Sequence, residues 1–233
     1  MLQSDGNNFR GCKIMIVLRR EIFSISLCFL GCLLLVPSCI LLIYPKEFTG
    51  LAIPGLIIAC LCLTASAVID LYEAYFQLYS IKEIALPNKT WQVFYTKCYQ
   101  MIGAGFFLAA SIMYLPSLAS KPFIGTTTAD LGTWVFRFGS FAYLGSSYRC
   151  LGGLIKSVQA RGNWLKQDAV SLIAICAFIL GSLFYIFGGV VGQMEIGPPS
   201  LMPELWVIGS LGFAVGSFIF FKKAVAEHFL PRS

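Results

Sequence analysis

Residues Leu131 to Leu154 read LGTWVFRFGSFAYLGSSYRCLGGL. A helix that crosses a bilayer needs about 20 mainly apolar residues, and this stretch is long enough. Its Gly and Ser residues are places where two helices can approach closely in lipid. It also contains Arg137 and Arg149, two of the few charges inside any apolar segment of the chain. The stretch therefore predicts a membrane-spanning helix with two arginines to explain.

The composition of the whole chain fits a membrane protein. Hydrophobic residues make up 58% of the 233 residues, and charged residues only 12%, about half of the ~25% that is usual in soluble domains. The mean hydropathy is +0.78. A soluble domain of this size could not bury so much apolar surface. The net charge of +6 comes from residues in the connections, so we interpret it as contact with lipid headgroups, and we expect no nucleic-acid partner.

Six apolar stretches have the length of a spanning helix, whereas the strands of a membrane barrel would be about 10 residues long with alternating polarity. We therefore predict an all-α fold: a polytopic membrane protein whose six transmembrane helices are arranged as three helical hairpins. The predicted spans are Ile22–Tyr44, Gly50–Tyr72, Tyr99–Ser117, Leu131–Leu154, Val170–Val191 and Pro203–Phe221.

The basic residues predict which side of the membrane each connection faces. Lys and Arg gather in cytoplasmic loops, and here thirteen would lie on one side, against Lys46 and Lys121 on the other. The thirteen are Arg10, Lys13, Arg19, Arg20, Lys82, Lys89, Lys97, Lys156, Arg161, Lys166, Lys222, Lys223 and Arg232. We expect both termini to be cytoplasmic, or on the equivalent inner side of an organelle.

This topology divides the chain into seven parts. They are a cytoplasmic N-terminal tail (1–21), a first transmembrane hairpin (22–73), an amphipathic and basic inner connection (74–98), a second hairpin (99–155), a basic inner connection (156–169), a third hairpin (170–221) and a cytoplasmic C-terminal tail (222–233).

The sequence contains none of the common catalytic or metal-binding motifs. The nine Cys include no CxxC pair, and His228 is the only His, so we expect no metal site and interpret the cysteines as small buried residues. No P-loop, HExxH motif, dinucleotide fingerprint or nucleophile–base pair occurs. We therefore predict no catalytic residues, no cofactor and no enzymatic activity.

The later hairpins resemble one another and a known module. MIGAGFFLAASIMYL, from Met101, and GTWVFRFGSFAYL, from Gly132, are similar to the YrhK-like domain, a two-helix membrane module. ILGSLFYIFGG, from Ile179, and ELWVIGSLGFAVGSFIFF, from Glu204, resemble the same module. The resemblance implies two or three tandem copies and an architecture, but no activity. Arg137 departs from it, because the module would have an apolar residue there.

We expect the small residues and two of the tryptophans in these helices to have structural roles. Since close packing over small residues drives helix association in lipid, we predict helix–helix contacts at Gly139, Ser140, Gly145, Gly181, Ser182, Gly209, Ser210 and Gly216. Trp134 and Trp206 each follow a short polar entry to a span. We expect both as anchors at the outer membrane interface, where amphipathic rings are common.

Four ionisable residues within or at the ends of spans are the candidate polar site: Asp70, Glu73, Arg137 and Arg149. Intramembrane charges are costly and therefore often functional. Asp70 and Arg149 both lie near the inner ends of their helices, which predicts a salt bridge between the first two hairpins. For Arg137 two interpretations remain open: a side chain that reaches outer headgroups, or an anion or substrate site in an outward cavity.

Two functions are compatible with these features. The first is a structural or interaction component, or an accessory subunit, of a membrane assembly, with protein partners or a homo-oligomer in addition to the bilayer. The alternative is a small-solute or ion transporter or channel, with its site between the hairpin repeats. A water-filled vestibule lined by the intramembrane charges would favour the alternative.

Overall fold

The structure, a computed structural model, describes residues 5–44, 49–80, 88–123 and 125–229. These residues form seven helices and one small β-ribbon, so the predicted all-α class is confirmed. The elements are α1 (Asp5–Ile43), α2 (Thr49–Ser80), α3 (Asn88–Met113), α4 (Pro116–Ala119), β1 (Pro122–Phe123), β2 (Thr126–Thr127), α5 (Thr128–Arg161), α6 (Lys166–Gln193) and α7 (Leu201–Phe229).

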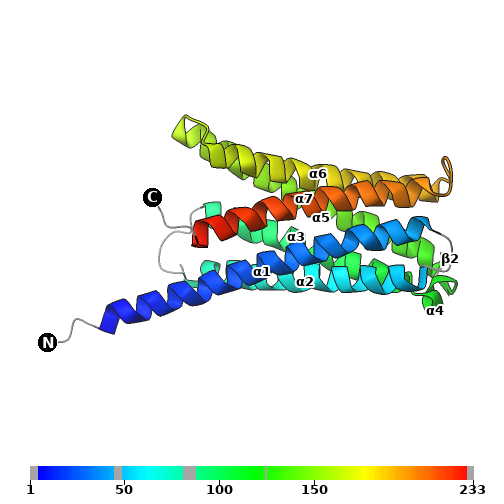
Figure 1. Cartoon of the computed structure of the whole chain (residues 1–233), viewed down its shortest axis with the longest axis horizontal. Helices are drawn as coiled ribbons and strands as arrows, with labels where there is room; N and C mark the ends of the chain where they lie inside the picture. The colour runs from blue at the N-terminus through cyan, green and yellow to red at the C-terminus, as the bar shows by residue number, and fades with distance from the viewer. Residues whose placement is uncertain (1–4, 45–48, 81–87, 124, 230–233) are drawn as a thin grey trace.

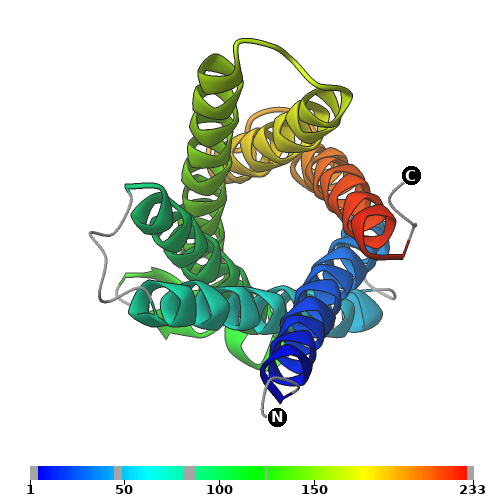
Figure 2. The ribbon, with the colours of Figure 1, turned by 90° about the vertical axis from the view of Figure 1, so that its left-hand side faces the viewer.

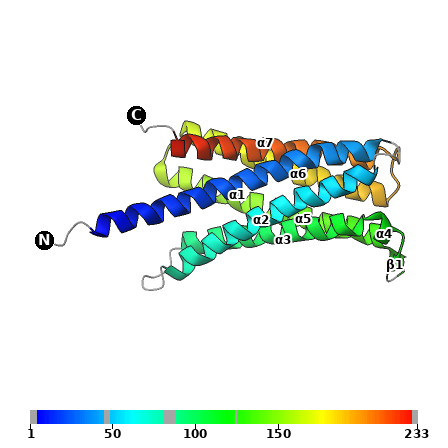
Figure 3. The same ribbon diagram turned by 60° about the horizontal axis from the view of Figure 1, so that its bottom comes forward.

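The six long helices form a closed ring in chain order. Each packs against the helix before it and the helix after it, and α7 packs back onto α1. Figure 2 shows this ring in a view along the helices. Consecutive long helices run in opposite directions, so α1 begins and α7 ends at the same end of the ring, which we call the N/C end (Figure 1). The opposite end carries α4, β1 and β2, and we call it the ribbon end (Figure 3).

Four of the long helices contain stretches that are long and apolar enough to cross a membrane, which supports membrane insertion. These stretches are Arg20–Ile43, Gly50–Tyr79, Lys166–Gln193 and Leu201–Ala226. They belong to α1, α2, α6 and α7. The other two long helices are more polar: α3 begins with several polar residues, and α5 carries Arg137 and Arg149.

The helices extend beyond the predicted spans. Part of the predicted N-terminal tail is the start of α1, and much of the predicted C-terminal tail is the end of α7. The predicted inner connection 74–98 is divided between the end of α2 and the start of α3, with 81–87 outside the described residues. Residues 1–4 and 230–233 of the predicted tails also lie outside them.

Specific caps fix where α5 begins and ends. At its start, the Thr127 hydroxyl accepts a hydrogen bond from the Asp130 backbone N–H (3.1 Å), and the Asp130 carboxylate accepts one from the Thr127 hydroxyl (2.6 Å). The hydrogen bond from the Thr127 hydroxyl, together with those from the Thr127 backbone N–H and the Thr126 hydroxyl, holds the pKa of the Asp130 carboxyl below its ordinary value. At its end, Gly162 adopts a left-handed conformation (φ 73°) that favours glycine. Arg161 then pairs with Asp168 of α6 at 2.5 Å, which holds the turn between the two helices together.

Neighbouring helices cross at small residues near the middle of the ring. A Cβ atom added to Gly181 would lie 2.8 Å from the carbonyl oxygen of Gly209, and one added to Gly209 would lie 3.0 Å from that of Gly181. The same close approach joins Gly103 of α3 and Gly139 of α5, at 3.1 and 3.0 Å. Glycine is needed at these positions because any side chain would push the helices apart.

The other residues predicted to pack also lie between helices or inside the ring. A Cβ atom added to Gly216 would lie 3.0 Å from the carbonyl oxygen of Ala174. Gly145 is less tightly enclosed, with its nearest neighbour, the Tyr99 ring, at 3.6 Å. The serines at 140, 182 and 210 are fully buried.

Large aromatic side chains fill the interior of the ring toward the ribbon end. Five buried rings make up this aromatic plug: Phe107, Phe136, Tyr185, Trp206 and Phe213. Phe136 stacks on Phe107 at 4.3 Å between ring centroids and on Trp206 at 5.0 Å. The Tyr185 hydroxyl lies 2.6 Å from the Ser210 hydroxyl, which satisfies it within the plug. On the α1 and α2 side, Leu35 and Leu56 complete the packing. The ring is therefore a packed core over this half of its length.

Candidate functional site: a central cavity

The half of the ring nearer the N/C end encloses a cavity of about 390 Å³. All six long helices contribute to its lining. On α1 the lining runs from Glu21 to Cys28, a rise of about 10 Å at 1.5 Å per residue. The deepest part of the lining includes Leu63 and Tyr143, which pack against the core that contains the aromatic plug. The cavity thus lies within the ring between the aromatic plug and the N/C end.

An ion pair between neighbouring helices faces this cavity. Lys97 of α3 places its Nζ 2.5 Å from Oδ2 of Asp70 on α2. The two side chains are 28% and 20% exposed although they point into the ring, which places them against the open space. The Ser24 hydroxyl of α1 donates to the other Asp70 oxygen, Oδ1. Both oxygens of the carboxylate therefore have a partner, and a charge-assisted hydrogen bond of this kind is among the stronger ones in proteins.

The predicted salt bridge between Asp70 and Arg149 is wrong. Asp70 binds Lys97, and the Arg149 guanidinium carbon lies over the rings of Tyr95 and Tyr99, at 5.6 and 5.3 Å from their centroids. The two residues lie at similar depth along their helices, but depth does not determine which residues face each other. Because successive helical residues are 100° apart, Arg149 lies on the exposed surface of α5 while its neighbour Cys150 lines the cavity.

Arg137 lies outside the cavity, between α5 and α6. Its side chain is only 7% exposed, and its guanidinium carbon lies 4.0 Å from the centroid of the Trp134 ring. The stem packs on Gly189 of α6, where an added Cβ atom would lie 2.7 Å from Arg137 Cγ. A cation over an aromatic face is stabilised by the ring quadrupole. Glu73, the fourth candidate, is partly buried on α2, three residues after Asp70, and does not line the cavity either.

The two predicted interface anchors have different positions. Trp134 is 45% exposed on the outer surface of the ring, whereas Trp206 is 2% exposed and belongs to the aromatic plug. The prediction of Trp206 as an interface anchor is therefore wrong. The reason is helix phase: Trp134 precedes Gly139 by five residues, but Trp206 precedes Gly209 by only three. The two rings therefore point about 200° apart around their helices.

Sequence reasoning missed Lys97 and Ser24 as site residues. The sequence predicts Lys97 in the basic inner connection, whereas α3 begins at Asn88 and places it within the helix, facing the ring interior. One signal was available in the sequence. A carboxylate inside an apolar segment requires a partner, and Lys97 is one of the two basic residues, with Lys89, that the next helix along the chain, α3, contains.

The remaining lining differs between the two sides of the cavity. Besides the ion pair, the α2, α3 and α5 side includes Ser66, Gln100, Ser146, Ser147 and Cys150. The large apolar side chains, Ile25, Ile175, Phe178 and Phe220, come from α1, α6 and α7, which also contribute Glu21, Ser217 and Lys223. A few polar groups in a mainly apolar pocket are typical of small-molecule sites.

Comparisons with protein-family models, curated proteins and solved structures find no match for this chain.

Proposed function

We propose that the protein is a six-helix membrane protein that binds a small solute in its central cavity and transports it across the membrane. The observation that carries this proposal is the Asp70–Lys97 ion pair, which faces open space inside a ring of apolar helices. Maintaining two charges there is costly, and such residues commonly mark a substrate path. A structural component or accessory subunit would not need a charged cavity. That function, with protein partners or a homo-oligomer, remains a prediction from the sequence alone.

The proposal includes α3 and α5 as membrane spans. At 1.5 Å per residue, their 26 and 34 residues extend about 39 and 51 Å, more than the ~30 Å hydrocarbon core of a bilayer. Each packs on one side against a helix that is apolar enough to span, so the ring as a whole would cross the membrane. By the charge distribution of the loops, the N/C end and the cavity would face the cytoplasm or an organelle's inner side.

The ring also supports the proposal of three hairpin repeats. The close crossings within the three hairpins are equivalent: Gly31 with Ala59, Gly103 with Gly139, and Gly181 with Gly209. In each helix the fourth residue after the crossing contributes to the core inside the ring, as Leu35, Leu63, Phe107, Tyr143, Tyr185 and Phe213. Three tandem copies of a YrhK-like two-helix module would give this pattern. Parallel repeats around a central site are one of the architectures of membrane transporters.

The plug and the cavity together resemble one state of an alternating-access transporter. Such proteins expose a central site to one side of the membrane at a time. Here the site lies on the N/C side of a packed aromatic layer, so transport would require the hairpins to move apart at the ribbon end. Because aromatic rings pack onto the crossing glycines, as Phe107 does on Gly139 and Phe213 does on Gly181, such a movement would carry these rings with their helices.

A transport assay with a blocked cavity tests the proposal. The full chain in proteoliposomes would be assayed for uptake of amino acids, amines, carboxylates, sugars and nucleosides. We expect uptake of at least one class above that of empty liposomes. Ser147→Trp, which fills the cavity, should abolish that uptake. The matched control Ser157→Trp, on the exposed surface of the same helix, should retain it. Uptake no greater than that of empty liposomes for every class, with no binding of any, would contradict the proposal.

A further inference from the structure

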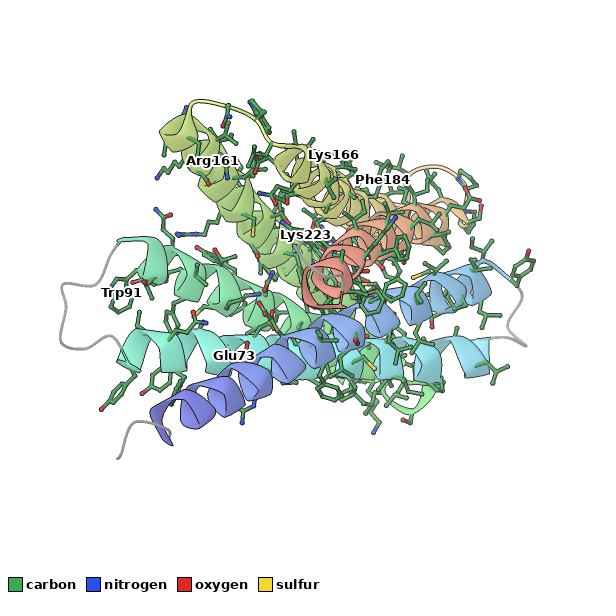
Figure 4. All side chains as sticks on the ribbon, turned by 60° about the vertical axis from the view of Figure 1, so that its left-hand side comes forward. Glu73, Trp91, Arg161, Lys166, Phe184 and Lys223 are labelled. Carbon is green, nitrogen blue, oxygen red and sulfur yellow. The ribbon has the colours of Figure 1, made fainter. Side chains whose placement is uncertain are left out.

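The charges that line the cavity are balanced. Its four charged side chains are Glu21, Asp70, Lys97 and Lys223, two acidic and two basic. Lys223 lies on α7 toward the N/C end, where Figure 4 shows it near the middle of the ring. A ligand with a net charge would leave one protein charge without a counter-charge, and an uncompensated charge away from water is strongly unfavourable. The lining therefore favours a ligand with no net charge.

The central ion pair favours a ligand that carries both charges. Asp70 and Lys97 come from two different helices and meet only through their side-chain ends. A ligand ammonium that donates to Asp70, together with a ligand carboxylate that accepts from Lys97, would separate the pair and leave each charge with an opposite partner. An uncharged solute could not replace either partner. The Ser24 hydroxyl, which donates to Oδ1, would keep the carboxylate oriented during this exchange.

The Asp70–Lys97 pair occupies one of three equivalent positions in the ring. With the glycine crossings aligned, Asp70 corresponds to Cys150 and Phe220, and Lys97 corresponds to Ile25 and Ile175. Only the junction of α2 and α3 therefore carries the pair. At the equivalent positions the other two junctions carry Cys150 with Ile175 and Phe220 with Ile25. Within the third hairpin, Phe178 stacks on Phe220 with ring centroids 6.0 Å apart. Such a cavity matches a molecule whose two ends differ in polarity.

We infer that the cavity binds a small amphipathic zwitterion, of the class of α-amino acids with a large apolar side chain. Its ammonium binds Asp70, its carboxylate binds Lys97, and its apolar side chain packs against Phe178, Phe220 and Ile175. The volume of about 390 Å³ is near the lower limit of small-molecule sites, roughly 300 to 1,000 Å³, and accommodates one such molecule. This inference rests on the proposed function, because it names the solute that the central cavity takes.

A series of ligand analogues tests the inference on the unmodified protein. The probe is phenylalanine, measured by direct binding to the purified full chain. Its analogues each lack one feature: phenethylamine lacks the carboxylate, 3-phenylpropionate lacks the ammonium, and glycine lacks the apolar body. We expect each analogue to bind about 10-fold to 100-fold more weakly, the usual effect of losing a hydrogen bond to a charged group or its equivalent in apolar contact. Equal binding of phenethylamine or 3-phenylpropionate would overturn the inference.

Variants and the wider solute panel separate this inference from the proposed function. Lys97→Met should lose phenylalanine binding, whereas Lys156→Met, an exposed lysine outside the cavity, should keep it. Phe220→Ala, which leaves the ion pair in place, should weaken phenylalanine but not glycine. If a sugar or nucleoside binds instead of phenylalanine, and the Ser147→Trp variant no longer binds it, the inference is wrong and the proposed function stands. If no solute of the panel binds, both are wrong.

Discussion

At the scale of single residues, the Asp70–Lys97 pair has to offset the cost of moving two charges out of bulk water. That cost is several kcal/mol per ion in a dry interior, but both side chains are partly exposed to the cavity. Ser24 adds a hydrogen bond to the carboxylate and also lies 3.0 Å from the Ser66 hydroxyl. The pair is therefore stabilised by a small polar network that joins α1, α2 and α3 at the N/C half of the ring.

Removing one member of this pair should destabilise the protein more than removing both. Lys97→Met leaves the Asp70 carboxylate without its cation, and Asp70→Asn leaves the ammonium without its anion. We expect each to lower the free energy of unfolding by about 1–3 kcal/mol, below the 3–5 kcal/mol for a fully buried pair because cavity water screens the charges. The double variant should recover part of the loss. Thermal unfolding in detergent measures this, with Lys156→Met as the control; additive losses would show that the pair is not coupled.

The sequence identified Asp70 as a residue that requires a partner, but it did not identify the partner. Depth along a helix follows from counting residues, and by depth alone Arg149 matches Asp70. Which residues of two helices face each other depends on the rotation of each helix about its axis. Hydropathy gives little information on rotation when lipid and core are both apolar. Trp206 was misplaced for the same reason.

At the scale of helices, close glycine crossings determine how the hairpins pack. In lipid no hydrophobic force draws helices together, so association depends on close van der Waals contact. At Gly181 and Gly209 the two backbones approach so closely that each carbonyl oxygen lies within about 3 Å of the place where the other residue's Cβ would be. The aromatic rings of Tyr185 and Phe213, one turn further along each helix, then fill the space that opens inside the ring.

Two Gly→Ala variants should therefore change stability in opposite directions. Alanine at Gly181 would place a Cβ atom 2.8 Å from a backbone oxygen. The helices would have to move apart, at a cost of about 1–3 kcal/mol. Alanine at Gly153 of α5 meets nothing within 4 Å, so the gain in helix propensity, up to about 1 kcal/mol, should remain. Melting temperatures in detergent compare the two. A neutral Gly181→Ala variant would mean that the crossing does not require glycine.

The helices themselves were largely predictable, because long apolar stretches between polar turns have few alternatives in structure. The residues at which the helices begin and end were less predictable. Lys97 and the residues before it look like a polar connection in the sequence, yet they form the first turns of α3. A polar residue at a helix end can face either solvent or an interior cavity, and local composition does not distinguish the two.

At the scale of the whole molecule, closure of the ring creates the cavity. The sequence predicts antiparallel neighbours along the chain, but it contains no signal that α7 packs against α1. Only that last contact encloses a central space. It brings Phe220 and Lys223 of α7 to the same cavity as Asp70 and Lys97. A site assembled from all six helices in this way has no local motif, since each helix supplies only a few lining residues.

The native cysteines lie where their reaction with a thiol reagent can show whether water reaches this cavity, so no substitution is needed. Cys28 and Cys150 line the cavity, whereas Cys39 and Cys60 are fully buried in the core beside the aromatic plug. Cys176 is exposed on the outer surface of α6, where lipid would cover it. A charged, membrane-impermeant thiol reagent reaches only residues that contact water.

We therefore expect the reagent to modify Cys28 and Cys150 from the N/C side of the membrane alone. Cys39, Cys60 and Cys176 should remain unmodified in the native protein and react after denaturation. Mass spectrometry of peptides from proteoliposomes of defined orientation gives the modified fraction at each cysteine. Modification of Cys28 from the ribbon side would mean that the plug does not seal the ring. Modification of Cys176 from water would mean that the outer surface of α6 does not face lipid, and the six-span ring would then have to be abandoned.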